Sequence, residues 1–242
     1  MTGGSFDLAG YAQTLSTLNG TGTVKLSSDL SGGRLTVGSG TFGGVIADGG
    51  AQPGELVVAG PGVFTLSGAN TFTGPTSVAG GIVNLDDGSL AGSIDIASGA
   101  ALIGTGKTGS ATIAGAVSPG DDGLGILTVG GTLKMKASAA YEVDLQSGGA
   151  DRIAVSGTAA LDGKIDVYAT RAHFGEIGQR YAIVTASGGR TGTFESVTWE
   201  GNPNLLFLDA ALSYDATAAY VSLERNGVAF ASVAATPNAA AT

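Results

Sequence analysis

The chain has 242 residues, with 43 glycines, no cysteine and a formal net charge of −9 from 11 basic and 20 acidic side chains. The lack of cysteine excludes disulfides, thiolate zinc sites and cysteine nucleophiles, and the acidic surface makes nucleic acids and anionic membranes poor partners. Glycine far exceeds its usual ~7% share but follows no three-residue period, which excludes collagen.

The first ten residues, MTGGSFDLAG, contain neither the basic nor the apolar segment of a signal peptide. The uninterrupted apolar runs elsewhere are far shorter than the ~18 residues of a membrane helix. If the protein is exported, we expect this chain to be a piece of a longer one.

Short apolar strands recur between glycine-rich turns over residues 1–132. The distance is 19 residues from Leu66 to Leu85 and 17 residues from Leu85 to Leu102. A period near twenty residues indicates a solenoid, and glycine interrupts the runs that have helical spacing, so each unit is predicted to consist of strands. The expected strands are Arg34–Val37, Glu55–Val58, Val63–Leu66, Gly81–Leu85 and Ser93–Ser98.

The stretch from Leu66 to Leu85, with the residues just before it, is predicted to form one coil and the start of the next. Glycine, proline and asparagine are the residues that turn a chain at corners. We therefore expect strands at 63–68, 71–73, 76–78 and 82–85, with corners at Ala69-Asn70, Gly74-Pro75 and Gly80-Gly81.

The composition changes after residue 132. Residues 1–132 hold 32 of the 43 glycines and five aromatic residues, whereas residues 133–242 hold 11 glycines and ten aromatic residues. In this second region apolar and polar residues alternate in TLKMKAS (132–138) and AYEVDLQ (140–146), as in strands with one buried face. The sequence therefore predicts two regions of one continuous structure.

These features together predict an all-β fold, a right-handed parallel β-helix. Stacked coils of about twenty residues bury inward-facing apolar ladders. If every residue joined the stack, the chain would form about eleven coils.

The sequence GANTFTGPTSVAGGIVNL resembles the β-strand repeat of Gram-negative autotransporter passenger domains. The matching residues are Gly68, Asn70, Thr71, Phe72, Thr73, Gly74, Thr76, Val78, Gly81, Val83 and Leu85. Residues 124–167, 178–197 and 207–226 are similar, in order and spacing, to the segment that closes many passengers. The resemblance covers residues 60–236 and implies that the second region is an autochaperone or junction region.

The resemblance implies three parts: coils of a passenger stalk (1–132), an autochaperone-type cap (133–232) and the start of a linker (233–242). The linker would lead to the protein's own outer-membrane β-barrel, which we expect beyond this chain. We accordingly expect a structural stalk on the bacterial surface, or secreted after cleavage, whose C-terminal region templates folding during export. The alternative is an adhesin that contacts host glycans or matrix proteins through its coil faces.

No enzyme site is predicted. His173 is the only histidine, so any Ser-His-Asp triad would need it, and no nucleophile-elbow motif is present. The acidic pairs Asp86-Asp87 and Asp121-Asp122 invite comparison with the calcium sites of pectin-cleaving β-helices. Both pairs lie beside glycine, where aspartate caps turns, so we expect turns there and no metal or other cofactor. The segment SGGADRIAV (147–155) resembles a calcium repeat only once, whereas such sites need tandem copies.

Four aromatic residues could form a sugar-stacking platform, but aromatic side chains bury large areas and more often fill a core. We expect these four to fill the wider C-terminal coils: Tyr181, Phe194, Trp199 and Phe207. We also expect weak end-to-end association, because β-helices expose ladder edges at their ends.

Overall fold

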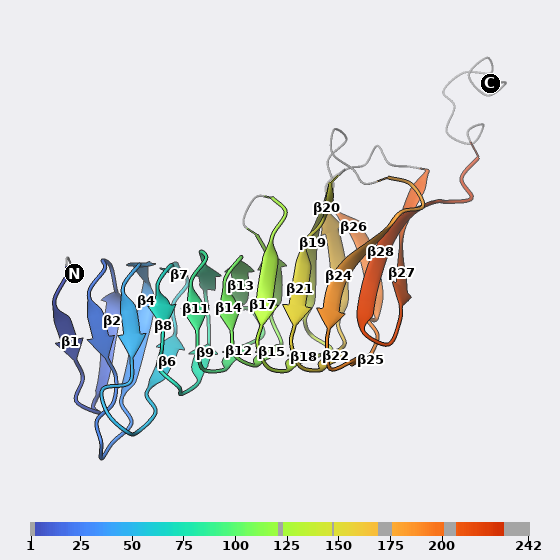
Figure 1. Ribbon diagram of the computed structural model, residues 1–242. Coiled ribbons are helices and arrows are strands. Elements are labelled where there is room, and N and C mark those ends of the chain that lie inside the picture. Colours follow the sequence, from blue (N-terminus) through green and yellow to red (C-terminus); the bar gives the residue numbers. More distant parts are fainter. Residues whose placement is uncertain (1–2, 121–122, 147, 169–175, 201–206, 230–242) are drawn as a thin grey trace.

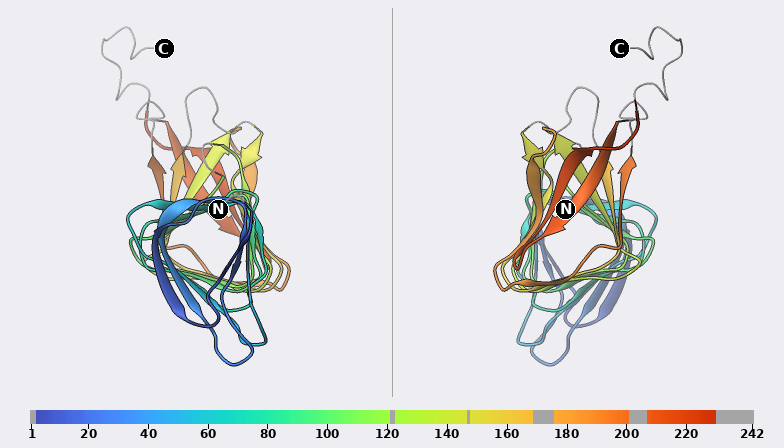
Figure 2. Two further views of the ribbon diagram at one scale, coloured as in Figure 1. Left: turned by 90° about the vertical axis from the view of Figure 1, so that its left-hand side faces the viewer. Right: turned by 90° about the vertical axis from the view of Figure 1, so that its right-hand side faces the viewer.

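The computed structural model describes residues 3–120, 123–146, 148–168, 176–200 and 207–229. Within these ranges the regular structure consists of β-strands, and no helix occurs. The strands stack into an elongated solenoid with the N-terminal and C-terminal coils at opposite ends (Figure 1). Seen along the axis, the coils enclose a core between three walls of strands (Figure 2).

Wall 1 receives one strand from each coil, and all its pairings are parallel. Its strands, in stacking order, are β2 (Ala12–Thr17), the first half of β4 (Arg34–Phe42), β6 (Glu55–Val58), β9 (Thr76–Val78), β12 (Ile94–Ile96), β15 (Ala111–Ile113), β18 (Leu133–Met135), β22 (Ala159–Leu161) and β25 (Arg190–Gly192).

Wall 2 follows wall 1 in each coil and is also parallel. It contains the second half of β4, then β7 (Val63–Leu66), β10 (Ile82–Leu85), β13 (Ala101–Gly104), β16 (Ala116–Pro119), β19 (Ala140–Gln146), β23 (Lys164–Tyr168) and β26 (Ser196–Glu200). A short strand, β20 (Gly149–Ala150), folds back antiparallel on β19.

Wall 3 closes each coil and is parallel until its last two strands. It begins with β1 (Ser5–Asp7), β3 (Thr23–Lys25) and β5 (Val45–Ala47), and continues with β8 (Ala69–Asn70), β11 (Ser89–Leu90), β14 (Lys107–Thr108), β17 (Ile126–Val129), β21 (Arg152–Val155) and β24 (Arg180–Ala186). It ends with the antiparallel strands β28 (Ala218–Arg225) and β27 (Leu208–Tyr214). In Figure 1, where the chain advances from left to right, the nearer strands of wall 3 point down and the more distant strands of wall 2 point up, so the coil is right-handed.

The predicted right-handed parallel β-helix is therefore confirmed, but its coils differ in length. Along wall 1 the paired residues are 22 apart at Ala12 and Arg34, 17 apart at Ile94 and Ala111, and 31 apart at Ala159 and Arg190. The helix makes about seven full turns, since seven coils, from β4 to β22, place a strand in all three walls within the described ranges, and the coils that contain β2 and β25 do not. The eleven coils calculated for a chain in which every residue joins the stack are not reached, because the C-terminal coils are long and the final strands turn antiparallel.

The core follows the alternation seen in the sequence. Buried and exposed positions alternate along most strands, so that Tyr141, Val143 and Leu145 of β19 are fully buried. Each buried side chain lies above its partner one coil earlier, as Val83 lies over Phe64. This stacking makes one continuous apolar core along the axis.

The coil that begins at Val63 differs from expectation at one corner. Ala69-Asn70, predicted to be a corner, forms β8 of wall 3, and residues 71–73, predicted to be a strand, lie in the corner that follows. Asn70 explains the difference. Its buried side chain hydrogen-bonds to backbone groups of the coils before and after it, so the chain stays within wall 3 at this point. Its Oδ1 accepts from Ile46 N at 3.0 Å, and its Nδ2 donates to Gly68 O at 3.0 Å and Ser89 O at 3.1 Å.

The glycine excess has a structural cause at two corners. At each corner a glycine stacks on the carbonyl oxygen of a glycine one coil earlier, and a Cβ atom built on Gly68 would lie 1.8 Å from Gly44 O. A Cβ on Gly74 would lie 1.9 Å from Gly54 O, and one on Gly92 would lie 2.0 Å from Gly74 O. Only glycine lets the turns of neighbouring coils approach this closely.

Among the described residues, no helix is long and apolar enough to cross a membrane.

Candidate functional site

At the C-terminal end of the solenoid, wall 3 ends in a reversal of strand direction. β24 continues wall 3 in parallel with β21, but its other neighbour, β28, is antiparallel, with Tyr181 opposite Val221. β27 then pairs antiparallel with β28 along its whole length. The outer part of this end is therefore an antiparallel sheet in the order β24–β28–β27, visible beyond the last coils in Figure 1. We call these three strands the cap; they form only a part of the predicted cap of residues 133–232.

An aromatic cluster fills the coils beside the cap. Tyr181 and Phe194 are each 5% exposed, and the ring centroids of Phe194 and Tyr141 are 6.1 Å apart. Tyr214 of β27 accepts a hydrogen bond from Phe194 N at 3.1 Å through its hydroxyl oxygen. The prediction that Tyr181 and Phe194 belong to the core is confirmed, because their side chains fill the wide C-terminal coils.

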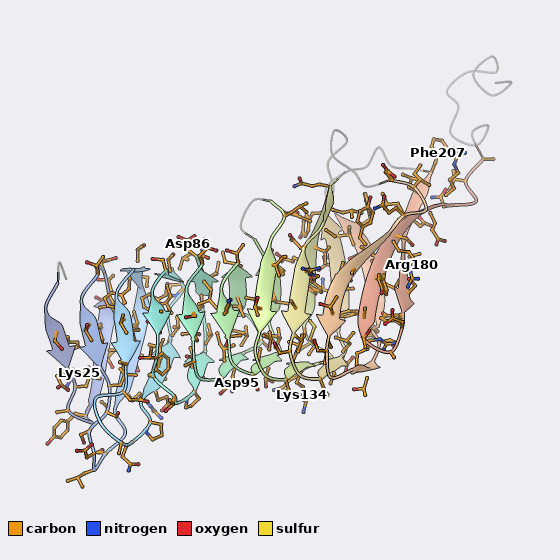
Figure 3. All side chains as sticks on the ribbon, in the orientation of Figure 1. Lys25, Asp86, Asp95, Lys134, Arg180 and Phe207 are labelled. Carbon is orange, nitrogen blue, oxygen red and sulfur yellow. The ribbon has the colours of Figure 1, made fainter. Side chains whose placement is uncertain are left out.

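The other two aromatic residues singled out in the sequence are less buried. Trp199 lies in β26, opposite Val167, and packs partly buried against the core. Its Nε1 is shielded from solvent and has no hydrogen-bond partner within the described ranges. Phe207 is half-buried and lies at the edge of the cap (Figure 3). The four residues therefore do not form one exposed platform.

A buried polar network links the walls beneath the cap. Asp151 is fully buried, and its two carboxylate oxygens accept from Gly125 N at 2.7 Å and Asp144 N at 3.0 Å. Burial raises the pKa of Asp151 to about 7, although these two N–H donors lower it and the Asp144 charge raises it further. Asp151 stands just before β21, so its carboxyl connects this segment to Gly125, just before β17, and to Asp144 in β19.

Tyr141 completes this network from wall 2. Its hydroxyl donates to Ile183 O of β24 at 2.7 Å and lies 3.3 Å from Asp151 O. Burial raises the pKa of the Tyr141 phenol well above its usual value. A neutral tyrosine donor therefore crosses the core and connects wall 2 to the cap.

A groove of about 790 Å³ runs over the outer face of wall 3 next to this network. It crosses β17, β21 and β24, and its lining includes Arg152 and Arg180 together with Leu124 and Ile126. Leu124 and Ile126 are 41% and 43% exposed. We call it the arginine groove.

The acidic pair Asp86-Asp87 lies in the bend between β10 and β11, where a turn is predicted. Asp87 has a positive φ of 55°, and its Oδ1 accepts from Thr105 Oγ1 at 2.7 Å. Both aspartates are exposed, and Figure 3 shows Asp86 on the outside of the coil. This pair is a turn, as its glycine neighbour indicates.

Asp121-Asp122 and His173 lie outside the described residues. Within the described ranges, no group of three or more histidine, aspartate or glutamate side chains could hold a metal ion. The residues with the most distinctive environments, Asp151, Arg152 and Arg180, were not predicted. Asp151 and Arg152 stand in the segment compared with calcium repeats, but nothing local in that segment indicates that the carboxyl is buried.

Comparison with known proteins assigns the repeat to a family. Residues 56–85 match the passenger-associated-transport-repeat. The chain is also similar to an extracellular serine protease of Serratia marcescens, with 31% identity over 196 residues. That alignment covers 76% of this chain but only 18% of the relative, so the chain spans less than a fifth of the protein it matches.

Proposed function

We propose, from the premise that this β-helix is an autotransporter passenger domain, that it is a structural stalk whose C-terminal region templates folding during export. Residues 133–232 would fold first, and residues 1–132 would then add coil by coil. The stalk would stand at the bacterial surface or be released from it. Residues 233–242 would lead toward the outer-membrane β-barrel of the same protein.

The strand pairings and core contacts at the C-terminal end support this proposal. A new parallel coil gains its hydrogen bonds and apolar contacts only from an edge that already exists, so the first coil has the highest cost. The C-terminal end has one pairing that does not depend on earlier coils, because β27 and β28 form a hairpin with Tyr214 opposite Ala219. β28 then pairs with β24 within the same region, although the paired residues are 33 to 42 apart in sequence. It also holds the Tyr141–Phe194 contact and the Asp151 network. These interactions favour it as the place where folding begins.

Limited proteolysis in mild denaturant tests the template role. We expect a resistant C-terminal fragment that begins between residues 100 and 140 and that folds when it is expressed alone. Nearest-neighbour coupling lets the two regions melt separately if their stabilities differ by more than their interface contributes. A single cooperative transition, or a C-terminal fragment that stays unfolded while residues 1–132 fold, would contradict the template role.

Two matched substitutions, each of which introduces a charge into the core, make this test more specific. Phe194→Asp should abolish the resistant core, because a charge would enter the apolar ladder beneath the cap. Phe64→Asp, at a fully buried position of β7, should loosen only the upstream coils. Equal loss of the C-terminal fragment in both variants would argue against independent folding of that end.

The protease activity named for the Serratia relative is not proposed for this chain. The matched region is a small part of that relative, and His173 is the only histidine that a triad here could use. A second candidate function, an adhesin-type binding module, has one specific observation in its favour, the arginine groove.

A further inference from the structure

The arginine groove concentrates positive charge on an acidic protein. The formal net charge of the chain is −9, yet the described residues that line the groove include two arginines and no carboxylate. The ion pairs within the described ranges lie elsewhere, at Arg34–Glu55 and Lys164–Asp166. The groove arginines therefore have no carboxylate partner in the described part of the chain.

Arg180 is held with its guanidinium in a defined orientation. Its Nε donates to Ser213 Oγ at 3.0 Å, and its guanidinium carbon lies 4.1 Å from the centroid of the Tyr220 ring. Tyr220 is itself positioned by its hydroxyl, which donates to Asp215 Oδ2 at 2.7 Å. Stacking and the Nε bond leave the terminal amino groups as a fork of donors, the geometry that binds oxyanions in a bidentate manner.

Arg152 lies on the neighbouring strand β21, in register with Ile126 of β17. Its Nε is shielded from solvent and has no hydrogen-bond partner among the described residues. Arg152 as a whole is half-buried and lines the groove, so a ligand there would approach its terminal amino groups and not this covered Nε. Both arginines thus present positive charge to the groove.

The strands beneath the groove argue against an extended peptide as the ligand. β17, β21 and β24 each have a paired neighbour on both sides, so no free strand edge is available there for main-chain pairing. Recognition would have to come from side chains: two separate cations and the exposed apolar surface of Leu124 and Ile126. A chain that carries its own repeated anionic groups and apolar sugar faces fits this pattern.

We propose that the arginine groove binds an acidic polysaccharide, with carboxylate or sulfate groups on Arg152 and Arg180. The inference rests on the binding-module candidate and is independent of the template role. The other end of the groove is less suitable, because the Thr105 hydroxyl there is bonded to Asp87. The carboxylates in contact with groove residues are already hydrogen-bonded, since Asp151 accepts from Gly125 N and Asp215 accepts from the Tyr220 hydroxyl. Exposed charges more than ~8 Å away are largely screened at physiological salt.

Titration calorimetry of the full chain tests this with a heparin-derived tetrasaccharide and a neutral tetrasaccharide of the same length. We expect saturable binding of the sulfated ligand only, weakened about tenfold by Arg152→Gln and by Arg180→Gln. Lys134→Gln is the matched control, because it removes one positive charge from the exposed face of wall 1, away from Arg180 (Figure 3). Thermal melting should show that all three variants are folded.

Three outcomes would overturn the proposal. The wild-type chain could bind the sulfated tetrasaccharide no better than the neutral one. Lys134→Gln could weaken binding as much as the groove variants, which would indicate diffuse attraction. An oligoglutamate peptide of equal charge could bind as tightly, which would indicate an acidic protein partner. None of these outcomes affects the proteolysis result, so failure of the groove and failure of the template role are distinguishable.

Discussion

Asn70 shows how one residue of the repeat connects three coils. Its side chain bonds backbone groups of Ile46, Gly68 and Ser89, one from each of three successive coils. An asparagine can do this because its amide has both an acceptor and two donors. The repeat residue is therefore a structural cross-link inside wall 3.

We expect Asn70→Ala to lower the free energy of unfolding by about 2–4 kcal/mol, since it removes the acceptor of the Ile46 N–H group and one donor each from Gly68 O and Ser89 O. Chemical denaturation of the upstream coils measures the effect. Asn84→Ala is the control, because the buried Asn84 Oδ1 has no hydrogen-bond partner among the described residues. Equal losses in the two variants would mean that the cross-link contributes little.

Asp151 should make stability depend on pH. Its pKa in the folded chain is about 7, above its usual value of 3.8. Between pH 4 and pH 7 the folded state therefore binds a proton that the unfolded state has lost, so stability falls as pH rises and levels off above pH 7. The contribution is at most about 4 kcal/mol, because each pKa unit corresponds to about 1.4 kcal/mol.

Denaturation at several pH values should show that Asp151→Asn flattens this slope. Burial raises the pKa of Glu142 as well, so the difference between variant and wild type isolates the Asp151 contribution. Asp95→Asn removes a carboxylate from an exposed position of β12 and should keep the slope. A wild-type slope that Asp151→Asn leaves unchanged would refute the assignment.

At the scale of the elements, the corners restrict the type of residue more strictly than the wall strands do. Wall strands tolerate different apolar residues, since Phe64, Val83 and Leu102 occupy one ladder. The glycine corners do not, because each glycine lies against the backbone of the previous coil. The period of the chain is therefore set by backbone contact at its corners as well as by side-chain packing in its walls.

Gly74→Ala should destabilise the upstream coils by about 1–3 kcal/mol, as overpacking does, because its Cβ would lie 1.9 Å from Gly54 O. Gly123→Ala is the matched control, since a Cβ there meets no atom within 4 Å. Melting temperatures of the two variants measure the difference. Equal melting temperatures would show that the corner relaxes without cost.

At the scale of the whole molecule, the two ends differ. The C-terminal end finishes in the antiparallel cap, whereas at the other end β1 pairs only with β3 and β2 only with β4 among the described strands. Unpaired edges of this kind can add a strand from another chain. Among the described strands, β25 pairs only with β22 and β26 only with β23, so both ends have unpaired edges and the C-terminal end differs in carrying the antiparallel cap.

These unpaired edges predict weak end-to-end association of the chain at high concentration. Light scattering over a dilution series should show an apparent mass that falls toward the monomer. Phe6→Lys, which places a charge at a partly buried position of β1, should suppress the association. Monomeric behaviour at every concentration would mean that the first coil closes its own end.

The alternation of apolar residues and the spacing of the glycines were enough to predict the fold, because in a β-helix each coil repeats the same local pattern against its neighbour. Strands such as Glu55–Val58 and Thr76–Val78 were predicted to the residue. The environments of Asp151, Arg152 and Arg180 depended on tertiary structure, since their partners come from other coils: Gly125 lies 26 residues from Asp151, and Ser213 lies 33 residues from Arg180. The reversal at β28 was also beyond local reasoning. An alternating strand has the same pattern whether its neighbour is parallel or antiparallel, and only packing against the last coil decides between them.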